Sequence, residues 1–357
     1  MTASVSKLTS KFEHKRELIL ASAAQRFNER GVKGATLADV ATGVGLSLKS
    51  LRYYFKRKDI LVAECFLRSI ETYTRLAREA AAGATPEERV RLLLAGFFEL
   101  IADVRGGRRP PFLHFGDIWS LEDPNRAPVH AALSDMFRQI RALLIIDDDV
   151  LDRRAVNARA HMLLSQLFWA VVWARRYEVD QLPRVVQRMH EILVGGLAAS
   201  PERLAEAAGR PPIESGDPSF HPQEAFLRVA TGLINERGYR GASVDKLAAE
   251  FQVTKGFFYH HNATKDDLIV ECFERTFRIM RQAQEDASRR SSAGLIRLWD
   301  ATASLVRFQR SDDAPLLRTS ALAAVPAELR TQMTTRMNNV TDRFSELLCD
   351  GMIAGDV

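Results

Sequence analysis

Residues 28–66, NERGVKGATLADVATGVGLSLKSLRYYFKRKDILVAECF, align without a gap with residues 235–273, NERGYRGASVDKLAAEFQVTKGFFYHHNATKDDLIVECF. Both stretches begin with NERG and end with Glu-Cys-Phe, at a constant offset of 207 positions. A repeat of this period predicts two related domains and not a solenoid of short units. Further identical pairs are Gly34 with Gly241, Ala35 with Ala242, Ala41 with Ala248, Lys58 with Lys265, Asp59 with Asp266 and Leu61 with Leu268.

The composition is typical of a soluble globular protein. The chain has 357 residues, of which 46% are hydrophobic and 27% charged, and this length allows two or three domains. No uncharged apolar run approaches the roughly 20 residues that span a bilayer, and the chain does not start like a signal peptide. The net charge of +5 leans towards an acidic partner. We therefore expect a cytoplasmic, reduced protein with no membrane segment.

Catalytic and cofactor motifs are not found in the sequence. There is no Gly-rich phosphate loop, no metal-ligand spacing and no nucleophile motif. The adjacent His260 and His261 would point about 100° apart on a helix and could not easily share one ion. Cys65 and Cys272 occupy equivalent positions of the repeat and are most simply read as small core residues. We expect no enzyme activity, no cofactor and no metal.

The first repeat reads as a series of helices. Apolar residues at three- and four-residue steps predict a helix whose buried face contains Ile19, Leu20, Ala23, Ala24 and Phe27. Gly31 suits the left-handed cap at the end of that helix.

Capping residues predict where the next helices begin. Thr36 with Asp39 resembles a capping box for a short helix that ends near residues 42–43. Ser47 is a third N-cap candidate, for a helix through Phe55. Lys58 begins a long fourth helix, and Thr264 with Asp267 offers a cap at the equivalent place in the second repeat.

Two short helices joined by a tight turn form a helix-turn-helix pattern, whose second helix lies in the DNA major groove. Lys49 and Arg52 can donate to guanine. The hydroxyls of Tyr53 and Tyr54 can reach phosphate, or the rings can pack on thymine methyls. Three further residues, Thr36, Ser47 and Lys58, lie at predicted helix N-termini, which favour phosphate.

The segments VGLSLKSLRYYFKRKDIL (44–61) and FQVTKGFFYHHNATKDDL (251–268) resemble the recognition-helix signature of the tetracycline-repressor (TetR) family. The resemblance implies an N-terminal DNA-binding domain, a helical domain for dimerisation, usually a small-molecule inducer, and repression. The positions that it implies for DNA contact are Thr36, Ser47, Leu48, Lys49, Arg52, Tyr53, Tyr54 and Lys58 in the first repeat, and Ser243, Thr254, Lys255, Gly256, Tyr259, His260, His261 and Lys265 in the second.

The two repeats depart from the signature at different positions. The first has Lys49 and Arg52 where the family usually has Gly and an aromatic residue, and the second has Asn262 where a Phe usually anchors the helix. Residues 1–60 hold twelve Lys and Arg against five Asp and Glu, whereas residues 217–268 hold six against seven. We therefore expect the first repeat to supply most of the phosphate affinity. The alternative is a ligand-sensing or protein-interaction scaffold in which the second, or both, helix-turn-helix units are inert.

Between the repeats the apolar spacing predicts helices at 87–104, 128–146, 156–176 and 183–199. By resemblance, the last two pair with those of a second protomer as a four-helix bundle, which implies a homodimer through residues 159–199. An unknown small-molecule inducer is expected beside the aromatic segment 108–130. Plain core packing is an equally good reading for each pocket candidate. These candidates are Phe112, His114, Phe115, Trp119 and Trp169.

The expected organisation is all-α, with two TetR-like units in tandem. The domains are 1–66 (helix-turn-helix), 67–199 (ligand binding and dimerisation), 200–219 (linker with a possible helix PERLAEAA), 220–273 (second helix-turn-helix) and 274–357 (a shortened helical domain). The second unit has too few residues for the dimer-forming helices, which indicates either a truncated chain or a unit that does not self-associate. The sequence also leaves open whether two chains pair or one chain forms a pseudo-dimer.

Overall fold

The computed structural model describes residues 2–145, 152–209, 222–241, 264–291, 293–325 and 327–357. Within these ranges every regular element is a helix, which confirms the all-α prediction. The chain divides into two compact units, Met1–Gly196 and Leu197–Val357. None of the helices in the described ranges is long and apolar enough to cross a membrane.

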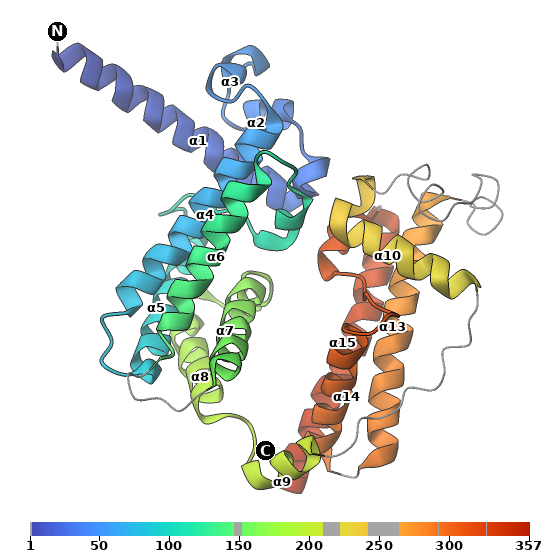
Figure 1. Cartoon of the computed structure of the whole chain (residues 1–357). Coiled ribbons are helices and arrows are strands. Elements are labelled where there is room, and N and C mark those ends of the chain that lie inside the picture. Colours follow the sequence, from blue (N-terminus) through green and yellow to red (C-terminus); the bar gives the residue numbers. More distant parts are fainter. Residues whose placement is uncertain (1, 146–151, 210–221, 242–263, 292, 326) are drawn as a thin grey trace. The chain divides into compact units, whose positions relative to one another are not determined.

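The first three helices of unit 1 form the helix-turn-helix domain (Figure 1). They are α1 (Thr2–Gly34), α2 (Leu37–Gly43) and α3 (Leu48–Tyr54). All five apolar residues predicted for the buried face of α1, from Ile19 to Phe27, are at most 2% exposed. Gly31 has a φ of 72°, so the chain kinks there in the left-handed conformation that glycine tolerates best. The start of each short helix agrees with its predicted cap.

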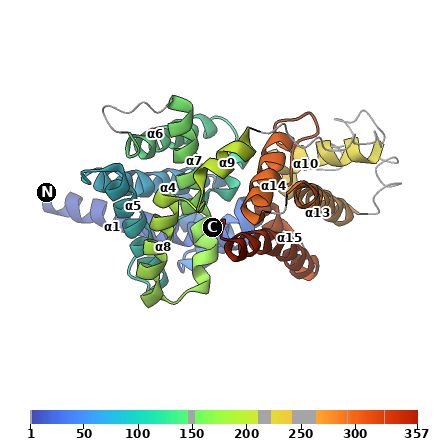
Figure 2. The same ribbon diagram turned by 90° about the horizontal axis from the view of Figure 1, so that it is seen from below.

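The longer helices of unit 1 build the helical domain on which the helix-turn-helix rests. Helix α4 packs against α1, α5 and α6, and α5 packs against α8 (Figures 1 and 2). Tyr73 of α4 lies in the middle of the core and is 1% exposed. The elements are α4 (Lys58–Ala80), α5 (Pro86–Arg105), η1 (Phe115–Ser120), α6 (Arg126–Ala142), α7 (Arg153–Trp173), η2 (Ala174–Arg176), η3 (Val179–Gln181) and α8 (Leu182–Gly195).

Helix α8 ends four residues before the predicted boundary at residue 199. Gly196 caps the helix with a φ of 80°. The apolar spacing extended the predicted helix past the Gly195-Gly196 pair, although glycine at this place commonly ends a helix. The fold also separates core from surface on α7 and α8, which the apolar pattern alone did not. Leu163, Leu167 and Val185 are buried, whereas Trp169 and Ile192 are 49% and 48% exposed.

Unit 2 is built from α9 (Pro201–Ala208), α10 (Pro222–Gly241), α13 (Lys265–Arg290), α14 (Gly294–Phe308), η4 (Thr319–Ala324) and α15 (Ala327–Ala354). Helix α9 is the predicted linker helix, and it packs on α14. The predicted capping box at the start of α13 is present: the Asp267 amide donates to the Thr264 hydroxyl, and the Thr264 amide donates to Asp267.

The sequence repeat is also a repeat of structure. Ser69 of α4 and Thr276 of α13 are equivalent, and each hydroxyl accepts a 2.9 Å hydrogen bond from the backbone of a loop, at Leu113 and Leu317. Cys65 and Cys272 are both buried, as predicted. Burial raises the pKa of each thiol to about 12, so neither is a reactive thiolate at neutral pH.

Candidate nucleic-acid interface

The recognition helix α3 is attached to the core by one side. Ser47 caps it by accepting a 3.1 Å hydrogen bond from the Ser50 amide. Leu51 is 0% exposed and Phe55, at its end, is 1% exposed, so these two residues fix the helix to the domain. The opposite side is exposed, with Tyr53 at 74%. Leu48, Lys49 and Arg52 are exposed on the same helix.

The N-terminus of α2 is closed by a reciprocal pair of hydrogen bonds. The Thr36 amide donates to Asp39 Oδ2 over 2.7 Å, and the Asp39 amide donates to Thr36 Oγ1 over 3.1 Å. The Thr36 hydroxyl also donates to the carboxylate, and the hydrogen bonds from Thr36 lower the pKa of Asp39. Thr36 therefore holds the helix-turn-helix in shape, and its hydroxyl proton is already committed.

The N-terminus of α4 carries a second group of charges. Arg57 makes two hydrogen bonds to Asp59, of 2.9 and 2.6 Å, and these lower the pKa of Asp59. Lys58 Nζ lies 3.5 Å from the Lys33 carbonyl oxygen. Among the residues that the structure describes, Lys49, Arg52 and Lys56 have no ion-pair partner. Three cations on α3 and in the turn that follows it are therefore available to an external anion.

An aromatic cluster that sequence reasoning missed joins α1 to α3. The rings of Phe12 and Tyr54 stack with centroids 4.8 Å apart, and Phe12 meets Tyr53 edge-on at 6.0 Å. Tyr54 is therefore half-buried, whereas Lys49, Arg52 and Tyr53 are exposed. A signal for this contact was present, because Phe12 lies seven residues before Ile19 on the apolar face of the same helix.

The second recognition segment lies outside the described residues. Ser243, Thr254, Lys255, Gly256, Tyr259, His260 and His261 all fall there. Lys265 is the first residue of α13.

Comparison with known proteins adds to this geometry. Residues 19–65 and 226–272 each match the sequence model of a family described as bacterial regulatory proteins, tetR family. The chain therefore carries two tetR-family domains in tandem. The first match begins at Ile19, a fully buried residue of α1, and ends at Cys65 on α4. It therefore covers the whole helix-turn-helix and the start of the helix that supports it.

Individual relatives cover only parts of this chain. The transposon Tn10 TetC protein of Escherichia coli is 36% identical over 62 residues, which are 15% of this chain. This chain spans about a third, 32%, of that protein's length. Solved structures include the regulator PfmR of Thermus thermophilus, with 22% identity and a TM-score of 0.40 over 50% of this chain and 98% of PfmR. A regulator of Bordetella parapertussis 12822 has 18% identity and a TM-score of 0.44 over 52% and 96%.

The five candidate pocket residues separate into two groups. Phe112 and Phe115 are buried against Tyr73, with ring centroids 6.1 and 5.3 Å away. His114 between them is half-buried, and burial together with the charge of Arg175 lowers its pKa to about 4. Trp119 and Trp169 are each 49% exposed. The structure brings the first three together near α4 and leaves the two tryptophans at the surface.

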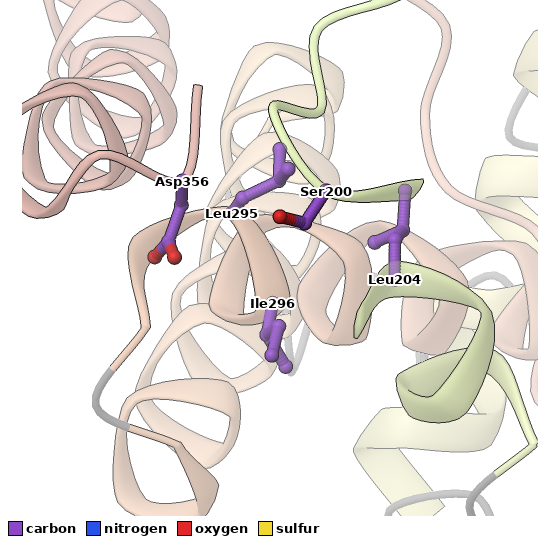
Figure 3. Close-up of a pocket in the computed structure, with 5 residues that line it drawn as sticks. All are labelled: Ser200, Leu204, Leu295, Ile296 and Asp356. Carbon is purple, nitrogen blue, oxygen red and sulfur yellow. The ribbon is translucent and has the colours of Figure 1, made fainter. Parts of the chain in front are cut away.

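A small recess lies within unit 2, where α9 packs on α14 (Figure 3). Its volume is about 10 Å³, which is no larger than a single water requires. It has no room for an organic ligand. It is lined by Ser200, Leu204, Leu295, Ile296 and Asp356.

Proposed function

We propose that this protein is a DNA-binding transcriptional regulator, a ligand-responsive repressor that reads operator DNA mainly through unit 1. The observation that carries the proposal is that α3 has one buried side and one exposed side. Leu51 and Phe55 anchor one side in the core, while Lys49, Arg52 and Tyr53 project from the other. A rigid helix with an exposed cationic and aromatic face suits entry into the major groove.

The exposed cationic and aromatic side chains of α3 have distinct roles in this proposal. Arg52 and Lys49 donate to guanine O6 and N7. Tyr53 contacts a phosphate or a thymine methyl group. Lys58 lies at the N-terminus of α4, whose helix dipole favours a phosphate. Phosphate contacts set the register of the helix, and base contacts set its sequence preference.

The proposed regulator acts as a homodimer through α7 and α8. Exposed positions on α7 follow one another at three- and four-residue steps, and three of them are large and apolar: Met162 at 58%, Trp169 at 49% and Val172 at 51%. Such a stripe suits packing against a helix of a second protomer. A two-fold dimer would place its recognition helices about 34 Å apart, on half-sites one helical turn from each other.

The proposed inducer is a small, partly apolar molecule that binds in the helical domain of unit 1. The support is the aromatic cluster beneath the helix-turn-helix, in which Phe168 of α7 meets both Tyr73 and Phe115, at 5.6 and 4.7 Å. A ligand that separates these rings would move α4 relative to α7 and so change the spacing of the recognition helices. Release of DNA then requires that the ligand favours the non-binding spacing.

Selection of binding sites from a pool of random duplexes tests the proposal. The intact chain is compared with Arg52→Ala/Tyr53→Ala and with Lys255→Ala/His260→Ala. A palindrome lost only in the first variant supports a homodimer that reads through unit 1. A composite site, of which each variant loses one half, would show that both units read DNA. No enrichment with the intact chain would reject DNA binding and favour the scaffold alternative.

A further inference from the structure

The N-terminal turns of α1 extend beyond the helix-turn-helix core, as Figure 1 shows. From Lys11 onward, where the structure describes the side chains of α1, the first fully buried residue is Ile19. The turn of α1 before Ile19 still contacts the recognition helix, because Phe12 stacks on Tyr54 and meets Tyr53 edge-on. The ring of Phe12 is 37% exposed. The segment of α1 from Lys11 to Leu18 is thereby held directly against the recognition helix.

Two charged residues of this segment form ion pairs with α4 inside the domain. Arg16 pairs with Glu64 of α4, and its guanidinium lies 5.4 Å from the centre of the Phe55 ring. Glu17 pairs with Arg68 of α4 at 3.1 Å. These contacts fix the rotation of α1 about its own axis, so the directions of the remaining side chains are set. Lys11 is exposed and Lys15 is half-buried, and neither has an ion-pair partner among the described residues.

Helical geometry places the remaining charged residues of this segment on different faces of α1. Lys11 and Lys15 are four residues apart, so they lie on one face of the helix. Glu13 is two residues from both Lys11 and Lys15, so it points about 160–200° away at roughly 100° per residue. The lysine pair, residues 11 and 15, is therefore not neutralised by an acid on its own face. The two positions are about 6 Å apart along the helix axis, at a rise of 1.5 Å per residue.

We propose that the lysine pair of α1 is a second phosphate-binding surface for the same DNA that α3 reads, and that Phe12 holds it in register with α3. The inference rests on the proposed function, because it needs α3 on DNA. Its partner follows from charge complementarity and from continuity with α3: the pair is cationic, and Phe12 beside it contacts Tyr53, an exposed residue of the recognition helix. The lysine pair adds affinity for the backbone and no base preference.

The test measures the salt dependence of binding with the intact chain and a fluorescein-labelled duplex of the selected site. Lys11→Gln/Lys15→Gln is compared with Arg153→Gln/Arg154→Gln, which removes two exposed charges from α7. Two lost phosphate contacts should lower the slope of log K against log salt by about 1.8. A slope equal to that of the α7 control would overturn the proposal.

The role of Phe12 has its own matched control on the same helix. Phe12→Ala keeps every charge but removes the ring that contacts α3, and Leu18→Ala removes an apolar side chain of similar exposure, 41% against 37%. Phe12→Ala should weaken binding several-fold more than Leu18→Ala. Equal binding by the two variants would overturn the positioning role.

Failure of this inference differs from failure of the proposed function. A scrambled duplex should show the same loss of slope with Lys11→Gln/Lys15→Gln, because phosphate contacts weaken binding uniformly across sequences. A loss confined to the selected site would overturn phosphate binding in favour of base reading. If the unsubstituted chain bound neither duplex, the proposed function itself would fail, and this inference with it.

Discussion

Asn28 and Asn235, which are equivalent in the repeat, make the same pair of hydrogen bonds in their two units. The Asn28 amide donates to the Phe112 carbonyl over 2.8 Å, and its oxygen accepts from the His114 amide over 2.9 Å. Asn235 donates to the Leu316 carbonyl over 2.8 Å and accepts from the Arg318 amide over 2.9 Å. Each asparagine thus clamps one loop to the helix on which it lies, α1 in unit 1 and α10 in unit 2.

Removal of the clamp should destabilise the unit that contains it. Asn28→Ala leaves the Phe112 carbonyl and the His114 amide without these partners, and each polar group left unpaired in this way costs about 1–3 kcal/mol. We expect a lower urea midpoint for unit 1, measured by tryptophan fluorescence, because three of the four tryptophans lie there.

Asn235→Ala is the matched control, read by Trp299, the one tryptophan of unit 2. Asn235→Ala should lower the urea midpoint reported by Trp299 and leave the urea midpoint of unit 1 unchanged. If neither variant moved its own midpoint, the clamp would have no part in stability.

A second repeated contact differs in burial between the units. Arg275 pairs with Glu224 at 2.5 Å and its side chain is 0% exposed, whereas the equivalent Arg68 pairs with Glu17 at 3.1 Å with 22% exposure. Burial tends to raise the pKa of Glu224, but the hydrogen bonds from Arg278 and Arg275 outweigh it, and the pKa is lowered. Glu224→Gln leaves a buried guanidinium without its counter-charge and should cost about 3 kcal/mol.

Glu17→Gln removes the same charge from the more exposed pair and should cost less than about 1 kcal/mol. Urea denaturation of both variants measures the difference. Equal losses would mean that burial of Arg275 does not decide the strength of its ion pair.

Local chemistry explains which parts of the fold the sequence predicted. The starts of α2 and α3 were predicted correctly because Thr36 and Ser47 bond to backbone amides three residues away. The contact of Phe12 with Tyr54 was missed, since it joins side chains far apart in the chain. For the same reason the pattern predicted Tyr54 as a DNA contact without its stacking on Phe12.

The sequence also could not predict which apolar residues of α7 are buried in the core and which are exposed at the surface. Leu167 and Trp169 are both apolar, and only the packing of α5 and α6 on α7 buries one and exposes the other. The candidate DNA contacts of α3 were accessible to prediction because a short helix with two buried anchors, Leu51 and Phe55, exposes most of its other positions.

The cap of α3 should matter for DNA binding more than for overall stability. Ser47→Ala removes the acceptor for the Ser50 amide and costs about 1 kcal/mol at the helix start. Because α3 has only seven residues, that loss should fray the helix and weaken binding of the selected duplex about five-fold, measured by fluorescence anisotropy. Ser50→Ala keeps the amide that Ser47 caps and is the control. Wild-type affinity in Ser47→Ala would show that DNA itself orders the helix.

Mild acid should destabilise unit 1 through His114. Burial and Arg175 lower its folded pKa to about 4, below an unfolded value of roughly 6.5. The unfolded chain therefore binds the proton first, so stability present above pH 6.5 is lost as the pH falls towards 4. The full loss is about 3 kcal/mol. His114→Gln should flatten the stability profile between pH 6.5 and 5, measured by urea denaturation at each pH. An unchanged profile in the variant would assign the acid sensitivity to other groups.

Charge on the exposed stripe of α7 should separate the protomers. Trp169 and Val172 are 49% and 51% exposed on the face proposed for dimerisation, and the burial of a carboxylate between two apolar stripes carries a large desolvation cost. Light scattering should therefore give Trp169→Glu/Val172→Glu the mass of one chain, 40.1 kDa, where the unsubstituted chain has about twice that mass. Trp299→Glu/Val306→Glu, on exposed apolar positions of α14 at 38% and 62%, is the control and should remain dimeric. Dissociation by the α14 variant and not by the α7 variant would place the dimer interface in unit 2, and the spacing of the recognition helices would then not be set by α7.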